Sequence, residues 1–264
     1  MPLKPTHLHP HNTAKQFVFL IIAALFFANP AQAQMDTIRD LYGRALSAYD
    51  NKDFDQAFDL YQQITKIAPG FAPAYNGMAL ANEAALGDED KTIAYLKTAI
   101  SYDPRLIQAY DNLGRIYYGR EDMDQAEEYF EKELKIDPNL SNAQLSLAWI
   151  NLLVKSRPEK AIKYFKMVLK VSQDPKIYYG LGQAYFASNQ RNDALDMITK
   201  LHELGQEDLA SRLEQSMREN AEVNAQTQNP DGNPSKPAGL GPVSPTTDKP
   251  TGMTVRLRGK LSDY

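Results

Sequence analysis

The chain has 264 residues, of which 43% are hydrophobic and 23% are charged, so it carries enough apolar side chains to bury a core. It contains no cysteine, which excludes disulfides, thiolate nucleophiles, cysteine-ligated zinc and a lipid-modified N-terminal cysteine. The formal net charge of -4 is mild and gives no reason to expect a nucleic-acid partner.

Residues 1–33 have the pattern of a secretory signal peptide. Lys4 and Lys15 precede a twelve-residue apolar run from Phe17 to Ala28, and a cleavage signal of small residues ends at Ala33. The run is short compared with the roughly 20 residues that a membrane-spanning helix needs. We therefore predict cleavage after Ala33 and an exported protein, periplasmic in a bacterium or otherwise secreted. The alternative is an uncleaved segment that anchors the chain in a membrane.

The chain then repeats with a period near 34 residues. Asp53-Phe-Asp-Gln-Ala57 reappears as Asp122-Met-Asp-Gln-Ala126. One row of small residues lies at Ala45, Ala79, Gly114, Ala148 and Gly182, and a second at Ala57, Thr92, Ala126, Ala161 and Ala194. Bulky residues follow the second row at Tyr61, Leu96, Phe130, Phe165 and Ile198. Two antiparallel helices per repeat would pack the small rows closely and fill the remaining space with the large side chains. The other explanation is a long bundle with accidental spacing.

The third copy closely resembles a tetratricopeptide repeat (TPR), with Tyr110-x-x-Leu113-Gly114-x-x-Tyr117, Ala126-x-x-x-Phe130 and Asp137-Pro138. The fifth copy is similar, with Tyr178-x-x-Leu181-Gly182-x-x-Tyr185. The resemblance implies an all-α, right-handed superhelical solenoid of about five helical hairpins. It also implies a concave wall, formed by the first helix of each hairpin, that binds peptides or helices of other proteins. Some positions depart from the pattern: Arg44, Thr92, Gln144 and Asn151.

We predict a TPR domain over residues 34–222. Its repeats lie at about 38–70, 72–105, 107–140, 141–174 and 175–205, and a capping helix follows at 206–222, with Leu209, Leu213 and Met217 on its apolar face.

Helix start and stop signals agree with these boundaries. Asp53 with Gln56, and Asp122 with Gln125, have the spacing of a capping box at the start of a second helix. Pro158 is expected in the first turn of a helix, where its missing amide proton costs nothing. Further prolines are expected to end second helices, at Pro69, Pro104, Pro138 and Pro175.

The C-terminal region changes in composition. Ten of the thirty residues 223–252 are Pro or Gly, which predicts a disordered linker. In residues 253–264, Met253, Val255 and Leu257 alternate with polar or basic residues. This alternation is typical of a peptide that adds to a sheet edge or docks in a groove, and equally of a frayed tail with chance alternation.

No catalytic constellation is visible, so we predict a protein that is not an enzyme and has no cofactor or metal. His7, His9 and His11 precede the apolar run and would leave with the signal peptide, and His202 stands alone on a helix. The acidic clusters Asp88-Glu89-Asp90 and Glu127-Glu128 are interpreted as solvated charge.

The candidate partner-binding residues lie three before, one after and four after the small residues of the first row, which places them on one helix face. The candidates are Tyr42, Tyr49, Asn76, Asp111, Arg115, Tyr118, Leu145, Trp149, Tyr179, Gln183 and Phe186. They predict a mainly aromatic groove for an amphipathic helix or an extended apolar peptide, with Trp149 as the first candidate anchor. Individual rings can instead pack between repeats.

Two functions fit this organisation. In the first, the protein is an exported, non-catalytic scaffold that holds components of a cell-envelope complex. In the second, it assembles with itself through the groove or through its C-terminal peptide.

Overall fold

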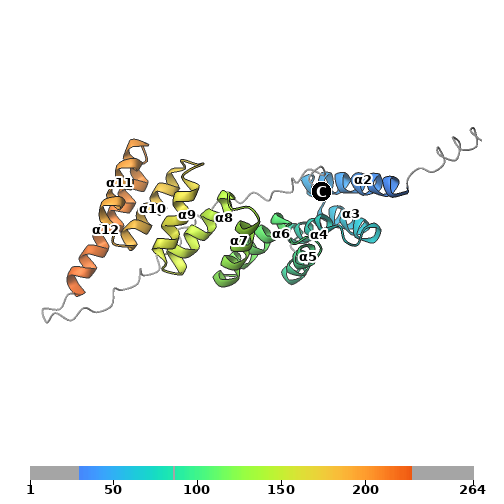
Figure 1. Ribbon diagram of the computed structural model, residues 1–264, viewed down its shortest axis with the longest axis horizontal. Coiled ribbons are helices and arrows are strands. Elements are labelled where there is room, and N and C mark those ends of the chain that lie inside the picture. The colour runs from blue at the N-terminus through green and yellow to red at the C-terminus, as the bar shows by residue number, and fades with distance from the viewer. Residues whose placement is uncertain (1–29, 86, 228–264) are drawn as a thin grey trace, which may run out of the picture. The chain divides into compact units, whose positions relative to one another are not determined.

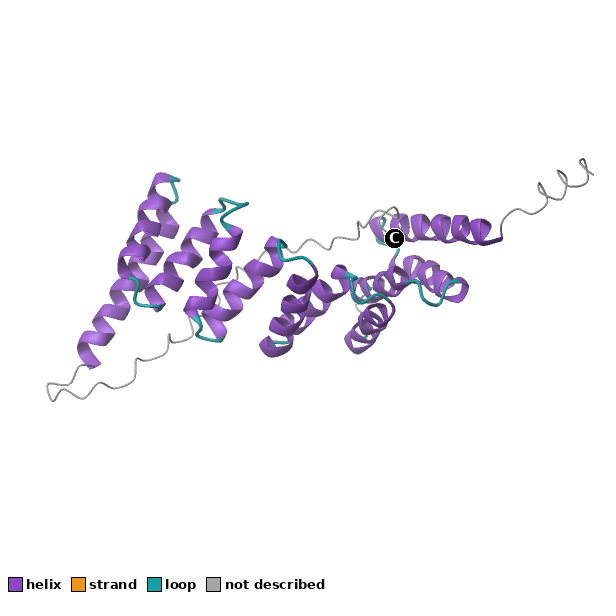
Figure 2. Cartoon of the chain, in the orientation of Figure 1, coloured by secondary structure: helices purple, strands orange, loops and turns teal. Residues whose placement is uncertain are grey.

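The computed structural model describes residues 30–85 and 87–227, with side chains to residue 219, and all regular elements in this part are helical (Figures 1 and 2). The described residues form two compact units, one up to Tyr102 and one from Asp103 on. The first unit contains α2 (Pro30–Asp50), α3 (Phe54–Ile67), α4 (Ala72–Ala84) and α5 (Glu89–Tyr102). The second contains α6 (Ile107–Gly119), α7 (Met123–Ile136), α8 (Ser141–Trp149), η1 (Ile150–Val154), α9 (Pro158–Val168), α10 (Pro175–Ala187), α11 (Arg191–Glu203) and α12 (Glu207–Thr227). Most of the predicted signal peptide and linker, and the whole C-terminal peptide, lie outside the described residues.

Consecutive helices pair as hairpins within each unit. α2 packs on α3 and α4 on α5 in the first unit; α6 packs on α7, α8 on α9 and α10 on α11 in the second. α12 packs against both α10 and α11, at the red end of the ribbon in Figure 1. The predicted all-α solenoid of TPR-type hairpins is therefore confirmed.

The two small-residue rows and the bulky row are buried throughout, as the period predicts. Gly114 shows why: a Cβ atom there would lie 2.7 Å from the ring of Phe130, across the α6–α7 hairpin. At Gly182 a Cβ atom would instead meet Leu213 of α12, so the last member of the row accommodates the capping helix. Small residues therefore permit the close helix approach on which each hairpin depends.

Two further glycines join neighbouring hairpins. A Cβ atom on Gly77 of α4 would lie 2.5 Å from the Tyr61 ring of α3, and one on Gly180 of α10 would lie 2.5 Å from the Phe165 ring of α9. The bulky residue of one hairpin thus packs against the first helix of the next, as well as within its own hairpin. The sequence pattern did not predict this second role.

The turns within the hairpins share one backbone motif. Lys52, Glu121 and Asn189 adopt φ values of 63°, 62° and 62°, in the left-handed region that favours glycine. In each case the next residue donates its N–H to the carbonyl five residues earlier, as Asp122 does to Tyr117 at 3.0 Å. This is the Schellman termination of a helix. Gly205 has φ 69° and occupies the corresponding place before α12.

The same motif explains why only one of the two hydrogen bonds of the predicted capping box forms at Asp122. The Asp53 side chain accepts from the Gln56 N–H at 3.2 Å, and Asp122 accepts from the Gln125 N–H at 3.1 Å, as expected. The Gln125 side chain does not reach back, and donates to Glu128 at 3.3 Å. The physical reason is that the Asp122 N–H is already bonded to the preceding helix.

The proline predictions hold with one exception. Pro69, Pro104 and Pro138 lie just beyond the ends of α3, α5 and α7, and Pro158 begins α9. Pro175 does not end a second helix: it occupies the first turn of α10, after Asp174 caps that helix through the Lys176 N–H. A missing amide proton is harmless there as well.

Gln144 is less of a departure than the sequence suggests. Its Nε2 donates to the Pro138 carbonyl at 2.6 Å, and the Tyr110 hydroxyl donates to the Pro104 carbonyl at 3.1 Å. Both side chains reach the carbonyl six residues earlier, so an amide replaces a phenol in the same hydrogen bond.

The capping helix packs as predicted through one face. Leu213 is fully buried, and Leu209 and Met217 lie half-buried against the cluster formed by Ile198 and Leu201 of α11. The helix continues to Thr227, past the expected boundary at residue 222.

Candidate functional site

The predicted groove residues all lie on the first helices of the hairpins. Tyr42 and Asn76 are buried. The remaining candidates are half-buried, and none is fully exposed: Tyr49, Asp111, Arg115, Tyr118, Leu145, Trp149, Tyr179, Gln183 and Phe186.

In the first unit the candidate rings contribute to packing. Tyr42 meets the rings of Tyr61 and Phe71 edge-on, with centroids 5.6 and 5.9 Å apart. Tyr49 meets Phe54 of α3 in the same way at 5.3 Å. These contacts join α2 to α3 and to the loop before α4. In the first unit the rings therefore pack between helices, which is the alternative to a role in partner binding.

Trp149 has the same packing role in the second unit. Its ring stands edge-on to Phe165, with centroids 5.1 Å apart, and its Cη2 also borders Gly180. Trp149 therefore holds α8 against α9 and α10. Trp149, the first candidate anchor, is thus half-buried and also has a structural role.

Three further aromatic residues of the stripe in the second unit are half-buried: Tyr118, Tyr179 and Phe186. Burial raises the pKa of the Tyr118 and Tyr179 phenols, so both hydroxyls stay protonated and able to donate a hydrogen bond. The Tyr179 hydroxyl accepts from Gln183 at 3.0 Å, and Arg191 lies over the Phe186 ring at 5.9 Å. Aromatic faces with polar tips are suited to holding a peptide or helix.

The third hairpin also contains a buried acid that the sequence analysis missed. Glu133 of α7 is 3% exposed, and its Oε2 has no hydrogen-bond partner. Burial, together with the charges of Asp111 and Asp137, raises the pKa of Glu133 to about 8. Asp111 is one of the groove candidates, so the buried acid interacts electrostatically with a candidate residue of the same hairpin.

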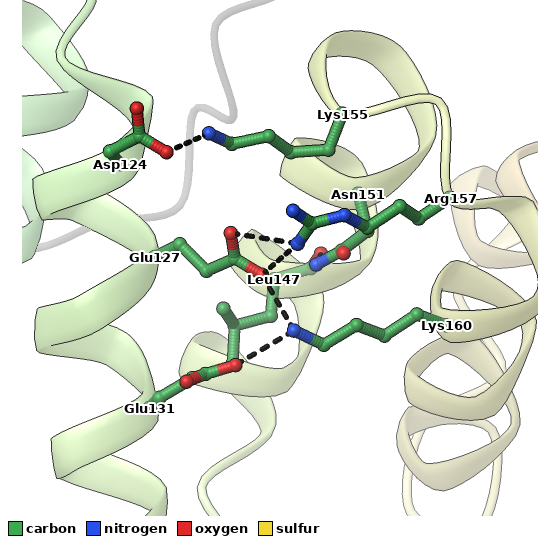
Figure 3. A network of polar contacts seen from close by, with 8 residues as sticks. All are labelled: Asp124, Glu127, Glu131, Leu147, Asn151, Lys155, Arg157 and Lys160. Carbon is green, nitrogen blue, oxygen red and sulfur yellow. Dashed lines mark hydrogen bonds and ion pairs between the residues drawn. The ribbon is translucent and has the colours of Figure 1, made fainter.

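An ion cluster joins the third hairpin to the fourth (Figure 3). Glu127 of α7 accepts from Arg157 Nη1 at 3.1 and 3.2 Å and from Lys160 Nζ at 2.6 Å. Lys160 also bonds Glu131 at 2.7 Å, and Lys155 pairs with Asp124. We call these six residues the α7–α9 ion cluster.

Glu127 corrects the prediction that the Glu127-Glu128 pair is solvated. Glu128 is exposed, but the Glu127 side chain is only 11% exposed. Burial opposes its ionisation, yet Lys160 and Arg157 outweigh that effect and hold the pKa of Glu127 below its ordinary value. The buried carboxylate is therefore charged and paired at neutral pH.

A π-helical turn precedes the basic residues of this cluster. η1 extends α8, and its Asn151 is fully buried and donates to the Leu147 carbonyl at 2.8 Å. The Arg157 N–H then bonds the Asn151 carbonyl at 2.8 Å, across Ser156 at φ 49°. Insertions of this kind often mark positions under functional or packing constraint. Here the turn leads into the segment that carries Lys155 and Arg157.

The described residues contain no group of three or more His, Asp or Glu side chains arranged to hold a metal ion. His202 pairs with Glu207 at 2.8 Å and lies 3.6 Å from Glu214, so it links α11 to α12. Over residues 30–85 and 87–227, no helix is both long and apolar enough to cross a bilayer.

These hairpins, with small residues where the helices cross and a half-buried aromatic stripe on the first helices, define a helical-repeat protein of the TPR class. The tetratricopeptide repeat family pattern matches residues 107–140 and, in a second form, residues 41–70. The chain thus contains tetratricopeptide repeats, as predicted.

Curated relatives contain the same repeats. The chain is 28% identical over 138 residues to small glutamine-rich tetratricopeptide repeat-containing protein 2 of Saccharomyces cerevisiae. The aligned region covers 52% of this chain and 39% of the relative. The chain is 25% identical over 110 residues to the protein of that name from Mycosarcoma maydis, covering 42% and 31%. The chain therefore spans well under half the length of these relatives.

Solved structures share the fold at low identity. A crystal structure of MamA protein superposes with a TM-score of 0.54 at 17% identity, covering 74% of this chain and 97% of MamA. The pilF protein of Pseudomonas aeruginosa superposes with a TM-score of 0.53 at 14% identity, covering 74% and 94%. The fold and the repeats together support a protein-interaction scaffold.

Proposed function

We propose that this protein is an exported, non-catalytic scaffold that binds a peptide or helix of a partner protein on the concave face of its TPR hairpins. The observation that supports it most is the stripe of half-buried rings on the first helices, chiefly Tyr118, Tyr179 and Phe186 in the second unit. TPR proteins generally act by binding other proteins. The stripe offers ring faces, with Gln183 and Asp111 as polar guides.

Export is the second part of the proposal. It rests on the basic start, the apolar run and the small-residue cleavage signal of residues 1–33. An exported scaffold would hold components of a cell-envelope complex, in the periplasm of a bacterium. N-terminal sequencing of protein purified from a fractionated native host tests this part. Mature protein that begins at Gln34 supports cleavage after Ala33; full-length protein in the cytoplasm rules export out.

Photo-crosslinking tests the binding face directly. A benzophenone amino acid replaces Tyr118 or Phe186 in the native host, and the control replaces Val171, which is 72% exposed and lies outside the stripe. We expect one discrete partner adduct from the stripe positions and none from position 171. Equal adducts from all three positions would remove the concave face from the proposal.

A substitution series checks the energetic contribution of the rings. Tyr118→Ala and Phe186→Ala are expected to weaken partner recovery by roughly tenfold or more, as for central aromatic contacts in other interfaces. Trp149→Ala is informative only beside a melting curve, because Trp149 also packs on Phe165 and Gly180.

A further inference from the structure

Glu133 interrupts an apolar row that the other repeats preserve. Its equivalents are Ile64, Ala99, Val168 and Leu201, and all are buried. Glu133 is equally buried at 3% exposure, yet its Oε2 has no hydrogen-bond partner. A buried polar atom without a partner is costly, so the Glu133 Oε2 atom calls for an explanation, and a group that satisfies it in a functional state is one.

The surroundings of Glu133 indicate the chemistry of that group. Asp111 on α6 and Asp137 directly after α7 both act on the Glu133 carboxyl, and with burial they keep it protonated near neutral pH. A cation at this place would be attracted by all three carboxyls and would favour ionised Glu133.

The chain itself carries a segment of complementary charge. Residues 253–264 contain Arg256, Arg258 and Lys260 against the single acid Asp263, and the basic residues alternate with apolar Val255, Leu257 and Leu261. Such a segment offers both cations for the acidic position and apolar side chains for the rings. The intervening residues 228–252 would span roughly 25–30 Å if they form the linker that their composition predicts.

We propose that the C-terminal segment 253–264 docks on the concave face of the α6–α7 hairpin, with a basic side chain beside Asp111 and Glu133 and apolar side chains against Tyr118. The inference rests on the proposed function, since it assigns the same face an occupant within the chain. Partner binding would then require displacement of this segment, so the segment would act as a built-in competitor.

The composition of the chain permits a direct test in the full-length protein. Trp149 on α8 is the one tryptophan and there is no cysteine, so Ser262→Cys gives one site for a dansyl-type acceptor. Energy transfer from Trp149 then reports docking. We expect clear transfer in this labelled chain. Replacing Arg256, Arg258 and Lys260 by Gln is expected to reduce transfer to the level measured in denaturant.

The acidic side of the contact is tested by Asp111→Asn combined with Glu133→Gln, which should cause the same loss. Asp196→Asn removes one carboxylate from an exposed position on α11 and should leave transfer unchanged. Far-ultraviolet circular dichroism checks that each variant is folded. The variant with Gln at positions 256, 258 and 260 alters no residue of the described helices. It therefore still decides the test if the variant with Asp111→Asn and Glu133→Gln loses structure.

Each outcome decides the proposal. Transfer that is independent of dilution shows docking within one chain and supports it. Transfer that is lost on dilution shows docking on a neighbouring copy and overturns the competitor within the chain. Transfer that is unchanged in the Arg256/Arg258/Lys260 variant, or absent in the unsubstituted tail, overturns it. If docking fails in this way, partner adducts at Tyr118 and Phe186 would still support the scaffold function. If energy transfer shows docking but no partner adduct forms, the scaffold function is refuted and this inference stands.

Discussion

The ring of Phe130 occupies the space that a Cβ atom on Gly114 would need, since Phe130 Cε1 lies 2.7 Å from that position. Gly114→Leu should therefore overpack the α6–α7 hairpin and lower the free energy of unfolding by roughly 1–3 kcal/mol or more. Gly119, on the same helix, has nothing within 4 Å of its Cβ position, so Gly119→Leu is the matched control. Urea unfolding followed by Trp149 fluorescence measures both. Equal midpoints for the two variants would contradict the helix pairing.

Substitutions at two left-handed turn residues are expected to change the free energy of unfolding in opposite directions. Glu121 has φ 62°, which costs a residue with a side chain about 1 kcal/mol relative to glycine. We expect Glu121→Gly to stabilise the second unit by about 0.5–1 kcal/mol. Gly205→Ala, at φ 69°, should destabilise by a similar amount although its surroundings are open. Thermal melts test both, and the same sign for the two variants would argue against the backbone explanation.

Glu127 holds the α7–α9 ion cluster together. Glu127→Ala would leave Arg157 and Lys160 without their shared partner, and we expect a loss of roughly 1–3 kcal/mol in unfolding free energy. Glu128→Ala is the control, because Glu128 is exposed and pairs with Lys132 along the same helix. Such an exposed pair contributes about 0.5 kcal/mol or less. A control variant as unstable as Glu127→Ala would show that burial does not distinguish the two acids.

The raised pKa of Glu133 predicts that the free energy of unfolding depends on pH in a direction that is unusual for a carboxyl. Its pKa is raised from 4.5 to about 8, so between these values the folded chain holds a proton that the unfolded chain releases. Its contribution to stability is fully present below pH 4.5 and is lost as the pH rises through about 8. Glu133→Gln cannot ionise, so its stability relative to the wild type should rise across this window by on the order of 3 kcal/mol. Unfolding midpoints at pH 5 and pH 8.5 measure the difference; a constant difference would refute the burial of an ionisable Glu133.

Leu213 tests the capping helix. It packs where Gly182 leaves room, so Leu213→Ala should cost roughly 2–4 kcal/mol locally. Because each hairpin contacts mainly its neighbours, amides of α10 and α11 should exchange faster while those of α2 stay unchanged. Hydrogen exchange resolved by peptide measures this, and uniform acceleration along the chain would exclude a local role.

Much of the fold was predictable because it depends on local, repeated signals. The period near 34 residues, the small rows and the caps at Asp53 and Asp122 each act within one hairpin, and all appear as expected. The location of the predicted groove residues on the first helices follows from helix geometry in the same way. How far each side chain is exposed did not follow, since Tyr42 and Asn76 are buried while Tyr118 is half-open.

The sequence by itself determined the repeat unit, the helix pairing within it and the capping helix, because these depend on spacing along one chain segment. The tertiary structure alone decided the contacts between hairpins, which are Phe165 against Gly180 and the charged Glu127 between Arg157 and Lys160. It also decided the burial of Glu133 within the third hairpin, where the charge of Asp111 helps to raise the Glu133 pKa. The neighbours of each of these residues come from another helix. Their burial and charge therefore depend on contacts that spacing along the sequence does not reveal.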